Sequence, residues 1–263
     1  MTSSPPSPIW TPAPLLITLE NPQVHIWRIS LDPPTPLLHS FETTLNADEL
    51  HRANRFRTPA LRRKFLAGRG ALRAILAAYL LRDPSTVTFA YESHGKPVIA
   101  GETTARLEFN LSHTADLALL ALAQGRPLGV DVEERKPMDN AEKIISRFFS
   151  PREQADFLAL PPADRNAAFF RAWTRKEAYL KAKGTGLSTQ LDSFDVTLKP
   201  SESPALTRIG DDPAEPARWS LLDLHPGPGF PAALAVLGRV LPSDLRLFDA
   251  DPWLTRTSMP QSD

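Results

Sequence analysis

The chain has 263 residues, 42% of them hydrophobic, which fits one large domain or two domains of about 120–130 residues with a substantial core. Lys plus Arg equals Asp plus Glu at 30 each, so no overall field favours a nucleic acid or a membrane surface as partner. Cysteine is absent, which excludes disulfides, thiol catalysis and thiolate metal sites, and we expect a cytoplasmic protein because the composition fits a reducing compartment.

The first 22 residues are rich in proline and lack the basic and apolar regions of a secretory signal. We expect residues 1–22 to form a loose arm. Residues 25–31 alternate in polarity and predict a first strand. Thr58 and Pro59 are a helix cap and a first-turn proline, and they predict a long helix over 59–81.

The polar side of this long helix is basic and includes Arg69, and Arg52 precedes it by a few residues. A solvated helix face explains such a run of arginines equally well as a phosphate-binding surface. The stretch 94–97 (HGKP) predicts a turn between strand-like residues 86–91 and 97–99. Lys96 and Pro97 belong to this turn, for which a plain hairpin is the simplest interpretation.

Three further strands are predicted in the middle of the chain. Residues 107–113 alternate as a half-buried strand that ends on Ser112 and His113. Residues 117–123 have helical propensity, but their short length suits a buried strand better. Residues 128–133 alternate with period two, which places the carboxylates of Asp131 and Glu133 on one face, where they repel each other unless they are exposed or bridged by a cation.

Ser150, Pro151 and Glu153 form a helix start, and this helix is expected to end at Leu160. The next helix, over 163–183, carries Trp173, Glu177 and Lys181 at i, i+4 and i+8, and therefore on one face. A Glu–Lys pair at this spacing is also common on solvated helices. Strands are expected at 195–198, 219–224 and 232–237, with a surface loop over 199–218 and a peripheral tail over 241–263.

Five blocks in this order resemble one family closely, the Sfp-type 4′-phosphopantetheinyl transferases. They are HGKP (94–97), FNLSH (109–113), GVDVE (129–133), RFFS (147–150) and WTRKEAYLKAKGTGLS (173–188). The resemblance covers residues 45–198, and the last block is highly specific. One departure is that Thr114 stands where many members have serine.

The resemblance implies an α+β fold with a pseudo-twofold duplication. Two similar α/β subdomains, at 23–127 and 128–240, each have a small antiparallel sheet and a long helix, with coenzyme A in the cleft between them. The implied enzyme moves 4′-phosphopantetheine from coenzyme A to a serine of an acyl or peptidyl carrier protein and releases 3′,5′-ADP. A pseudo-dimer of this kind needs no second subunit, so we expect a monomer.

The resemblance also implies roles for single residues. Asp131, Glu133 and Glu177 match magnesium ligands, and Glu177 is the first candidate for the base that takes the serine proton, directly or through water. Lys181, with Lys176 as second candidate, is expected to stabilise the leaving phosphate. The other positions expected to contact coenzyme A are Arg52, Arg69, Lys96, Pro97, Ser112 and His113. A structural role for Arg69 is equally compatible with the sequence, and the carrier protein is expected to meet a surface within 133–160.

Two other functions are compatible with the same residues. The acids and lysines could activate water, as in a metal-dependent hydrolase of nucleotide pyrophosphates. The chain could instead be a non-catalytic module that binds coenzyme A or a carrier protein, although the motif acids Asp131 and Glu177, whose loss would mark such a module, are present.

Overall fold

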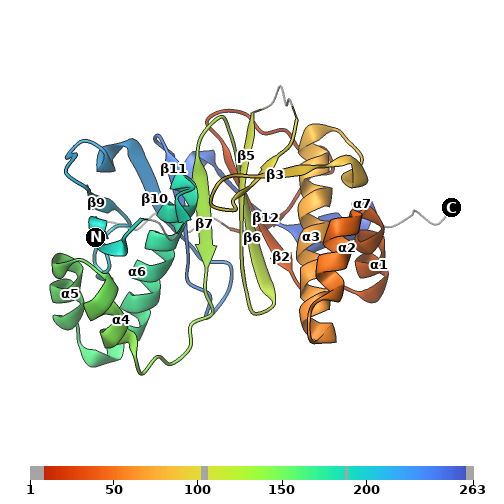
Figure 1. The fold of residues 1–263 in the computed structure, drawn as a ribbon. Coiled ribbons are helices and arrows are strands. Elements are labelled where there is room, and N and C mark those ends of the chain that lie inside the picture. Colours follow the sequence, from red (N-terminus) through yellow and green to blue (C-terminus); the bar gives the residue numbers. More distant parts are fainter. Residues whose placement is uncertain (1–8, 102–105, 187–188, 259–263) are drawn as a thin grey trace.

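A computed structural model describes residues 9–101, 106–186 and 189–258. Parts of the predicted arm (1–8), of the predicted tail (259–263) and of the last motif (187–188) lie outside these residues. The described chain forms four layers, helices on a sheet followed by a second sheet and more helices (Figure 1). No helix in the described ranges is long and apolar enough to cross a membrane.

The elements follow the chain in this order. The helices are α1 (Thr35–Thr44), α2 (Ala47–Asn54), α3 (Pro59–Leu80), α4 (Ala141–Phe148), α5 (Pro151–Leu158), α6 (Pro162–Lys183) and α7 (Ala250–Ser258). The strands of the first half are β1 (Thr11–Pro12), β2 (Val24–Ser30), β3 (Phe89–Tyr91), β4 (Pro97–Ile99), β5 (Leu107–Thr114) and β6 (Leu117–Gln124). The later strands are β7 (Leu128–Val132), β8 (Phe194–Val196), β9 (Leu206–Ile209), β10 (Trp219–Leu224), β11 (Ala232–Leu237) and β12 (Leu245–Asp249).

Two sheets carry the two halves. The first has the order β1-β12-β2-β6-β5 and the second the order β10-β11-β7, while β3-β4 and β8-β9 are separate two-stranded ribbons. Helices α1, α3 and α7 cover the outer face of the first sheet, and α4, α5 and α6 cover the outer face of the second. The predicted fold class, two α/β units that each join a small sheet to a long helix, is confirmed.

The alternation of side chains decides which face of each strand enters which core. Along β6, Ala118, Leu120 and Leu122 pack toward α3, whereas Leu119, Ala121 and Ala123 pack between the two sheets. Along β7, Val130 and Val132 point into the core between the sheets. The predictions of a buried strand at 117–123 and of two different faces at 128–133 are therefore confirmed.

The C-terminal segment differs from the peripheral tail expected at 241–263. Strand β12 lies inside the first sheet, parallel to both β1 and β2, and α7 buries Trp253 and Leu254 against the first half. The first sheet is consequently mixed rather than purely antiparallel. The apolar alternation of 245–249 is short, so nothing local in the sequence indicates which sheet it joins.

Candidate functional site

Helix α6 lies directly against β7, and a glycine makes this approach possible. A Cβ atom added at Gly129 would lie 2.2 Å from the carbonyl oxygen of Ala178 and 2.4 Å from the nitrogen of Ala182. Backbone atoms cannot rotate away as a side chain can, so only glycine fits here. The close contact brings the face of α6 that carries Glu177 and Lys181 over the end of β7.

Asp131 is the most confined acid of this site. It is 3% exposed, and its Oδ1 atom accepts hydrogen bonds from Lys181 Nζ at 2.6 Å and from the Ser112 hydroxyl at 3.0 Å. The Lys181 ammonium also donates to the Ser112 hydroxyl at 2.9 Å. The second oxygen, Oδ2, is buried and has no hydrogen-bond partner. An unsatisfied carboxylate oxygen is costly to bury, so it identifies a position for a missing donor or cation.

The negative charge of Asp131 affects the pKa values of two nearby acids, Glu133 and Glu177. Burial raises the pKa of the Glu177 carboxyl, and the negative charges of Asp131 and Glu133 raise it further. Burial and Asp131 likewise raise the pKa of Glu133, against the opposing effects of Lys181 and of a hydrogen bond from Trp173. Burial and the charge of Asp131 disfavour the charged forms of both glutamates, and a nearby cation would stabilise these charged forms.

The three acids do not form a closed cage by themselves. Among the residues that the structure describes, no group of three or more His, Asp or Glu side chains is close enough to hold a metal ion alone. Mg²⁺ is typically bound by one or two carboxylates together with phosphate oxygens and water, rather than by a cage made only of protein. The donor set of Asp131, Glu133 and Glu177 therefore fits an ion shared with a phosphate ligand.

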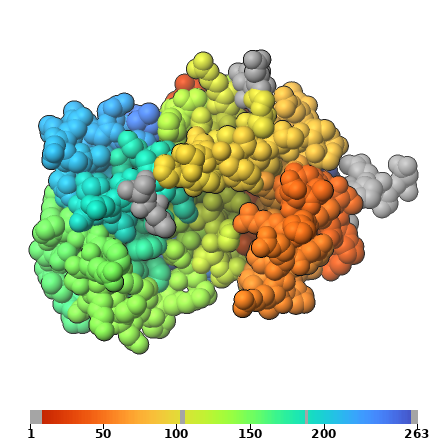
Figure 2. All heavy atoms as spheres, viewed as in Figure 1, coloured from red at the N-terminus to blue at the C-terminus, as the bar shows by residue number. Residues whose placement is uncertain are grey.

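The β3-β4 hairpin crosses from the first half to the second. Lys96 donates to the carbonyl of Leu128 at 3.5 Å, and its side chain passes close to Gly184, which ends α6 in a left-handed conformation. Pro97 opens β4 opposite Tyr91. Figure 2 shows a hollow between the orange helices of the first half and the green helices of the second, with the yellow hairpin segment above it. The hairpin thus borders the junction where β5 and β7 meet α6.

His113 and Arg52 remain accessible to a ligand. His113 is exposed at the end of β5, and partial desolvation together with the nearby charges of Lys181 and Lys64 lowers its pKa. Arg52 is exposed in the last turn of α2, 5.3 Å over the ring of Phe65. Both side chains can therefore donate to an anion.

Arg69 is occupied by contacts inside the first half. Its guanidinium forms an ion pair with Glu49 and lies 3.9 Å from the centre of the Phe89 ring, and its side chain is 13% exposed. Glu49 also pairs with the buried Arg73 and closes the capping box at the start of α2. This network supports the structural alternative for Arg69.

The expectation that Lys176 contacts the leaving phosphate is wrong. Its side chain is fully buried, 2.9 Å from Glu153 on α5, and its ammonium donates to the carbonyls of Leu191 and Phe194. Burial lowers the pKa of Lys176 and raises that of Glu153, so each charge depends on the other. Lys176 therefore joins α6 to α5 and β8 instead of facing Asp131.

One residue at the junction was missed by sequence reasoning. Asn110 is buried on β5, and its Oδ1 accepts the backbone N–H of Val130 at 2.9 Å. The signal was the polar series Asn110, Ser112 and Thr114 at alternate positions of the strand. Such a series places three polar side chains on one face of the strand.

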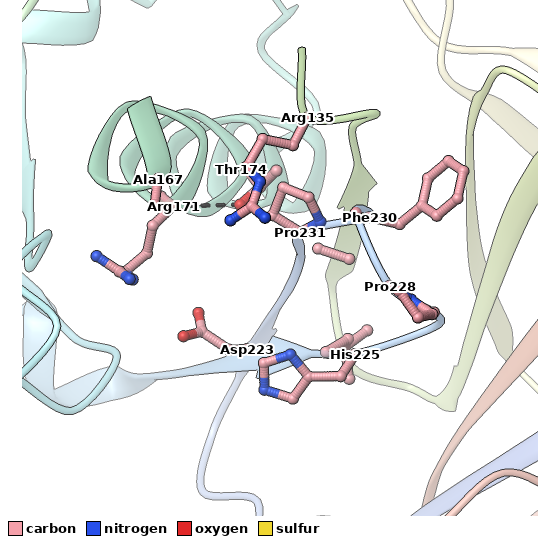
Figure 3. A pocket seen from close by; sticks show the side chains of 13 residues that line it. Arg135, Ala167, Arg171, Thr174, Asp223, His225, Pro228, Phe230 and Pro231 are labelled. Carbon is pink, nitrogen blue, oxygen red and sulfur yellow. Dashed lines mark hydrogen bonds between the residues drawn. The ribbon is translucent and has the colours of Figure 1, made fainter. Parts of the chain in front are cut away.

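A separate hollow of about 550 Å³ lies beside α6 (Figure 3). Its walls include Arg135, Arg171, Asp223, His225 and Phe230. Both oxygens of Asp223 are taken by the guanidinium of Arg175, at 2.8 and 2.7 Å. None of the predicted site residues lines this hollow.

The chain was compared with known proteins. Residues 127–235 match the family described as the 4′-phosphopantetheinyl transferase superfamily, and residues 32–125 match the family described as 4′-phosphopantetheinyl transferase, N-terminal. The 4′-phosphopantetheinyl transferase HetI of Nostoc sp. is 45% identical over 230 residues, which cover 87% of this chain and 94% of HetI.

A more distant relative carries the same family name. The 4′-phosphopantetheinyl transferase Sfp of Bacillus subtilis is 31% identical over 158 residues, which cover 60% of this chain and 68% of Sfp. The solved structure of Thermotoga maritima holo-[acyl-carrier-protein] synthase is 26% identical and covers 43% of this chain and 64% of its own. Its TM-score is 0.34, an overlap too small to bear on the fold.

Proposed function

The chain belongs to the 4′-phosphopantetheinyl transferase superfamily, and we propose that it transfers phosphopantetheine from coenzyme A to a carrier-protein serine at the junction of β7 and α6. The observation that carries this location is the buried Asp131, whose Oδ1 is held by Lys181 and Ser112 while its Oδ2 has no partner. In the reaction, the serine oxygen forms a bond to the phosphorus next to the pantetheine arm. The bond from that phosphorus to 3′,5′-ADP breaks.

We propose Asp131, Glu133 and Glu177 as the ligands of a Mg²⁺ ion. The unpartnered Oδ2 of Asp131 and the raised pKa values of Glu133 and Glu177, to which the charge of Asp131 contributes, support this set. When bound, Mg²⁺ supplies positive charge next to the phosphoryl oxygens, where negative charge develops during transfer.

The proton of the carrier serine needs an acceptor, and Glu177 is the best placed group. This role follows from the match of Glu177 to the family motif, since a bound Mg²⁺ would offset the negative charges that raise the pKa of Glu177 in the metal-free protein. Glu177 also lies on the face of α6 that carries Lys181. The proton can reach Glu177 directly or through one water molecule.

Lys181 is proposed to stabilise the phosphate of the departing 3′,5′-ADP. Its side chain is 29% exposed, so it can reach a ligand while its ammonium remains bonded to Asp131. For the rest of coenzyme A, we propose contacts with Lys96 and Pro97 of the hairpin and with His113 and Arg52. Each of these either borders the junction or carries an accessible donor.

Two broader assignments complete the proposal. We place the protein in the cytoplasm, in keeping with a chain that has no cysteine. We expect it to act as a monomer, since the two halves of one chain already meet at the proposed site. The carrier protein is expected to dock on the second half, within residues 133–160.

Intact-mass spectrometry tests the proposal. An apo carrier protein is incubated with this protein, coenzyme A and Mg²⁺, and we expect a mass gain of one phosphopantetheine that chelation of the metal prevents. Glu177→Gln should abolish the gain, whereas Glu202→Gln, which removes a carboxylate from a distant turn, should not. Steady release of 3′,5′-ADP without a carrier would indicate a hydrolase instead. Binding of coenzyme A without any transfer would indicate a binding module.

A further inference from the structure

Strands β5 and β7 run side by side, although they belong to different sheets. The N–H groups of Glu133 and Arg135 donate to the carbonyls of Pro231 and Gly229, in the direction of β11. Because N–H directions alternate along a strand, the N–H groups of residues 130, 132 and 134 point to the opposite edge. This open edge of β7 faces β5.

Three side chains of β5 occupy that edge. The N–H of Val130 donates to Asn110 Oδ1 at 2.9 Å, the N–H of Val132 to the Ser112 hydroxyl at 3.3 Å, and the N–H of Glu134 to the Thr114 hydroxyl at 3.3 Å. The sequence offset is constant, so the three bonds form a regular series between parallel segments. We call Asn110, Ser112 and Thr114 the side-chain ladder. It replaces the backbone hydrogen bonds that would join two strands of one sheet.

Ser112, the middle member of the ladder, also hydrogen-bonds two residues of the proposed site, Asp131 and Lys181. The Ser112 hydroxyl donates to Asp131 Oδ1 at 3.0 Å and accepts from Lys181 Nζ at 2.9 Å, besides accepting from the N–H of Val132. A hydroxyl has one donor and two acceptor positions. The capacity of Ser112 is therefore filled by protein groups, and its side chain is buried.

We propose that Ser112 is a positioning residue, which orients Asp131 and Lys181 through the ladder. The ladder fixes the position of β7 along β5. Ser112 also hydrogen-bonds Asp131 on β7 and Lys181 on α6, so the same residue that aligns the strands orients these two side chains. Asn110 and Thr114 support it from either side. The proposed effect of Ser112 on turnover rests on the proposed transferase function. The three hydrogen bonds of the ladder do not depend on that function.

The first experiment separates positioning from substrate contact. Initial rates are measured with coenzyme A and with 3′-dephospho-coenzyme A for the wild type and for Ser112→Ala. Loss of a group that orients a metal-site ligand typically costs about 10–100-fold. We expect a loss of this size in kcat, by the same factor for both substrates. A loss confined to coenzyme A would show that Ser112 binds the 3′-phosphate, and the proposal would fall.

Two further variants guard against a folding defect. Ser112→Thr keeps the hydroxyl and should recover most of the lost rate, whereas Lys183→Met, at an exposed residue outside the ladder, should behave as the wild type. If Ser112→Thr is as slow as Ser112→Ala while Ser112→Ala melts at the wild-type temperature, the hydroxyl is not the important group. That result would overturn the assignment.

Amide hydrogen exchange tests the ladder without any turnover. The N–H of Val132 should be protected in the wild type and should exchange at least about tenfold faster in Ser112→Ala, because its acceptor is gone. The N–H of Val130 should respond in the same way to Asn110→Ala. Fast exchange of both amides in the wild type would refute the ladder even if the enzyme were active. Protection in a protein that transfers nothing would instead refute only the proposed function.

Discussion

The ammonium of Lys181 lies 2.6 Å from the carboxylate of Asp131, and the Ser112 hydroxyl contacts both groups. The contact joins the two secondary-structure elements, α6 and β7, that carry the proposed metal ligands. Asp131 is nearly buried while Lys181 reaches solvent, so the pair presents its positive end to an incoming ligand.

Replacement of this lysine should affect the reaction much more than the fold. Lys181→Met removes the charge proposed to stabilise the leaving phosphate, and the loss of one such donor typically lowers kcat by about 100–1,000-fold. Lys183→Met, two residues along the same helix and exposed, is the matched control and should retain the wild-type rate. Mass-spectrometric initial rates measure both. Retention of the wild-type kcat by Lys181→Met would contradict the assigned role.

Lys176 should behave in the opposite way. Lys176→Met leaves Glu153 buried with an unpaired charge, which typically costs about 3–5 kcal/mol of unfolding free energy. The double variant Lys176→Met with Glu153→Gln removes both charges and should recover most of that loss. Urea unfolding measures stability, and transfer per folded molecule should stay at the wild-type level in each variant. Loss of transfer at unchanged stability would return Lys176 to the active site.

Glu177→Gln should make the metal-free protein more stable at neutral pH. The folded-state pKa of Glu177 is raised, so its charged form is disfavoured by the fold. The stability that Glu177 contributes is therefore highest below its unfolded pKa and is lost as the pH rises through the folded pKa. The gain for Glu177→Gln should be on the order of 0.5–2 kcal/mol at about pH 8 and should shrink at about pH 4.5.

Denaturant titrations in the presence of a chelator measure this difference. Glu202→Gln, in a turn whose hydrogen bond from the N–H of Lys199 a glutamine can also accept, supplies the baseline for removing one carboxylate. A gain of equal size at both pH values would mean that the electrostatic explanation is wrong.

Gly129→Ala should destabilise the contact of α6 with β7. The new methyl group would meet backbone atoms at 2.2 and 2.4 Å, and overpacking of this kind typically costs about 1–3 kcal/mol or more. Gly227→Ala is a suitable control, because its Cβ would meet only the ring of Phe230 at 3.9 Å. Thermal unfolding distinguishes the two variants. Equal melting temperatures would show that α6 can move away from β7 without cost.

The sequence predicted the local features of the site well. The caps at Asn46, Thr58 and Ser150 are formed as expected, because each depends on residues only three positions apart. The faces of β7 and α6 were also predicted, since they follow from the periods of strand and helix. Lys176 was the exception, although it is displaced by about 100° around the helix from Glu177. The helical period alone therefore argued against its place on the catalytic face.

Long-range features could not be predicted in the same way. The partners of Lys176 are Glu153 on α5 and the carbonyls of Leu191 and Phe194, and all of them lie 15 or more residues away in sequence. The ladder of Asn110, Ser112 and Thr114 depends on β7 lying beside β5, which no local pattern specifies. Strand β12 was misplaced for the same reason, because pairing partners of a short strand are chosen by the tertiary fold.

The position of β12 has a consequence for how this protein can be made. Residues 245–249 lie between β1 and β2, so the sheet of the first half is complete only after residue 249 has been synthesised. Domains generally fold as units during synthesis, starting from the N-terminus, but here the first unit must wait for the last strand. The nascent N-terminal half therefore exposes an unpaired edge of β2 to chaperones. We expect a fragment that ends at residue 240 to aggregate through the unpaired edge of β2 in its first half. This fragment would still contain every residue of the proposed site.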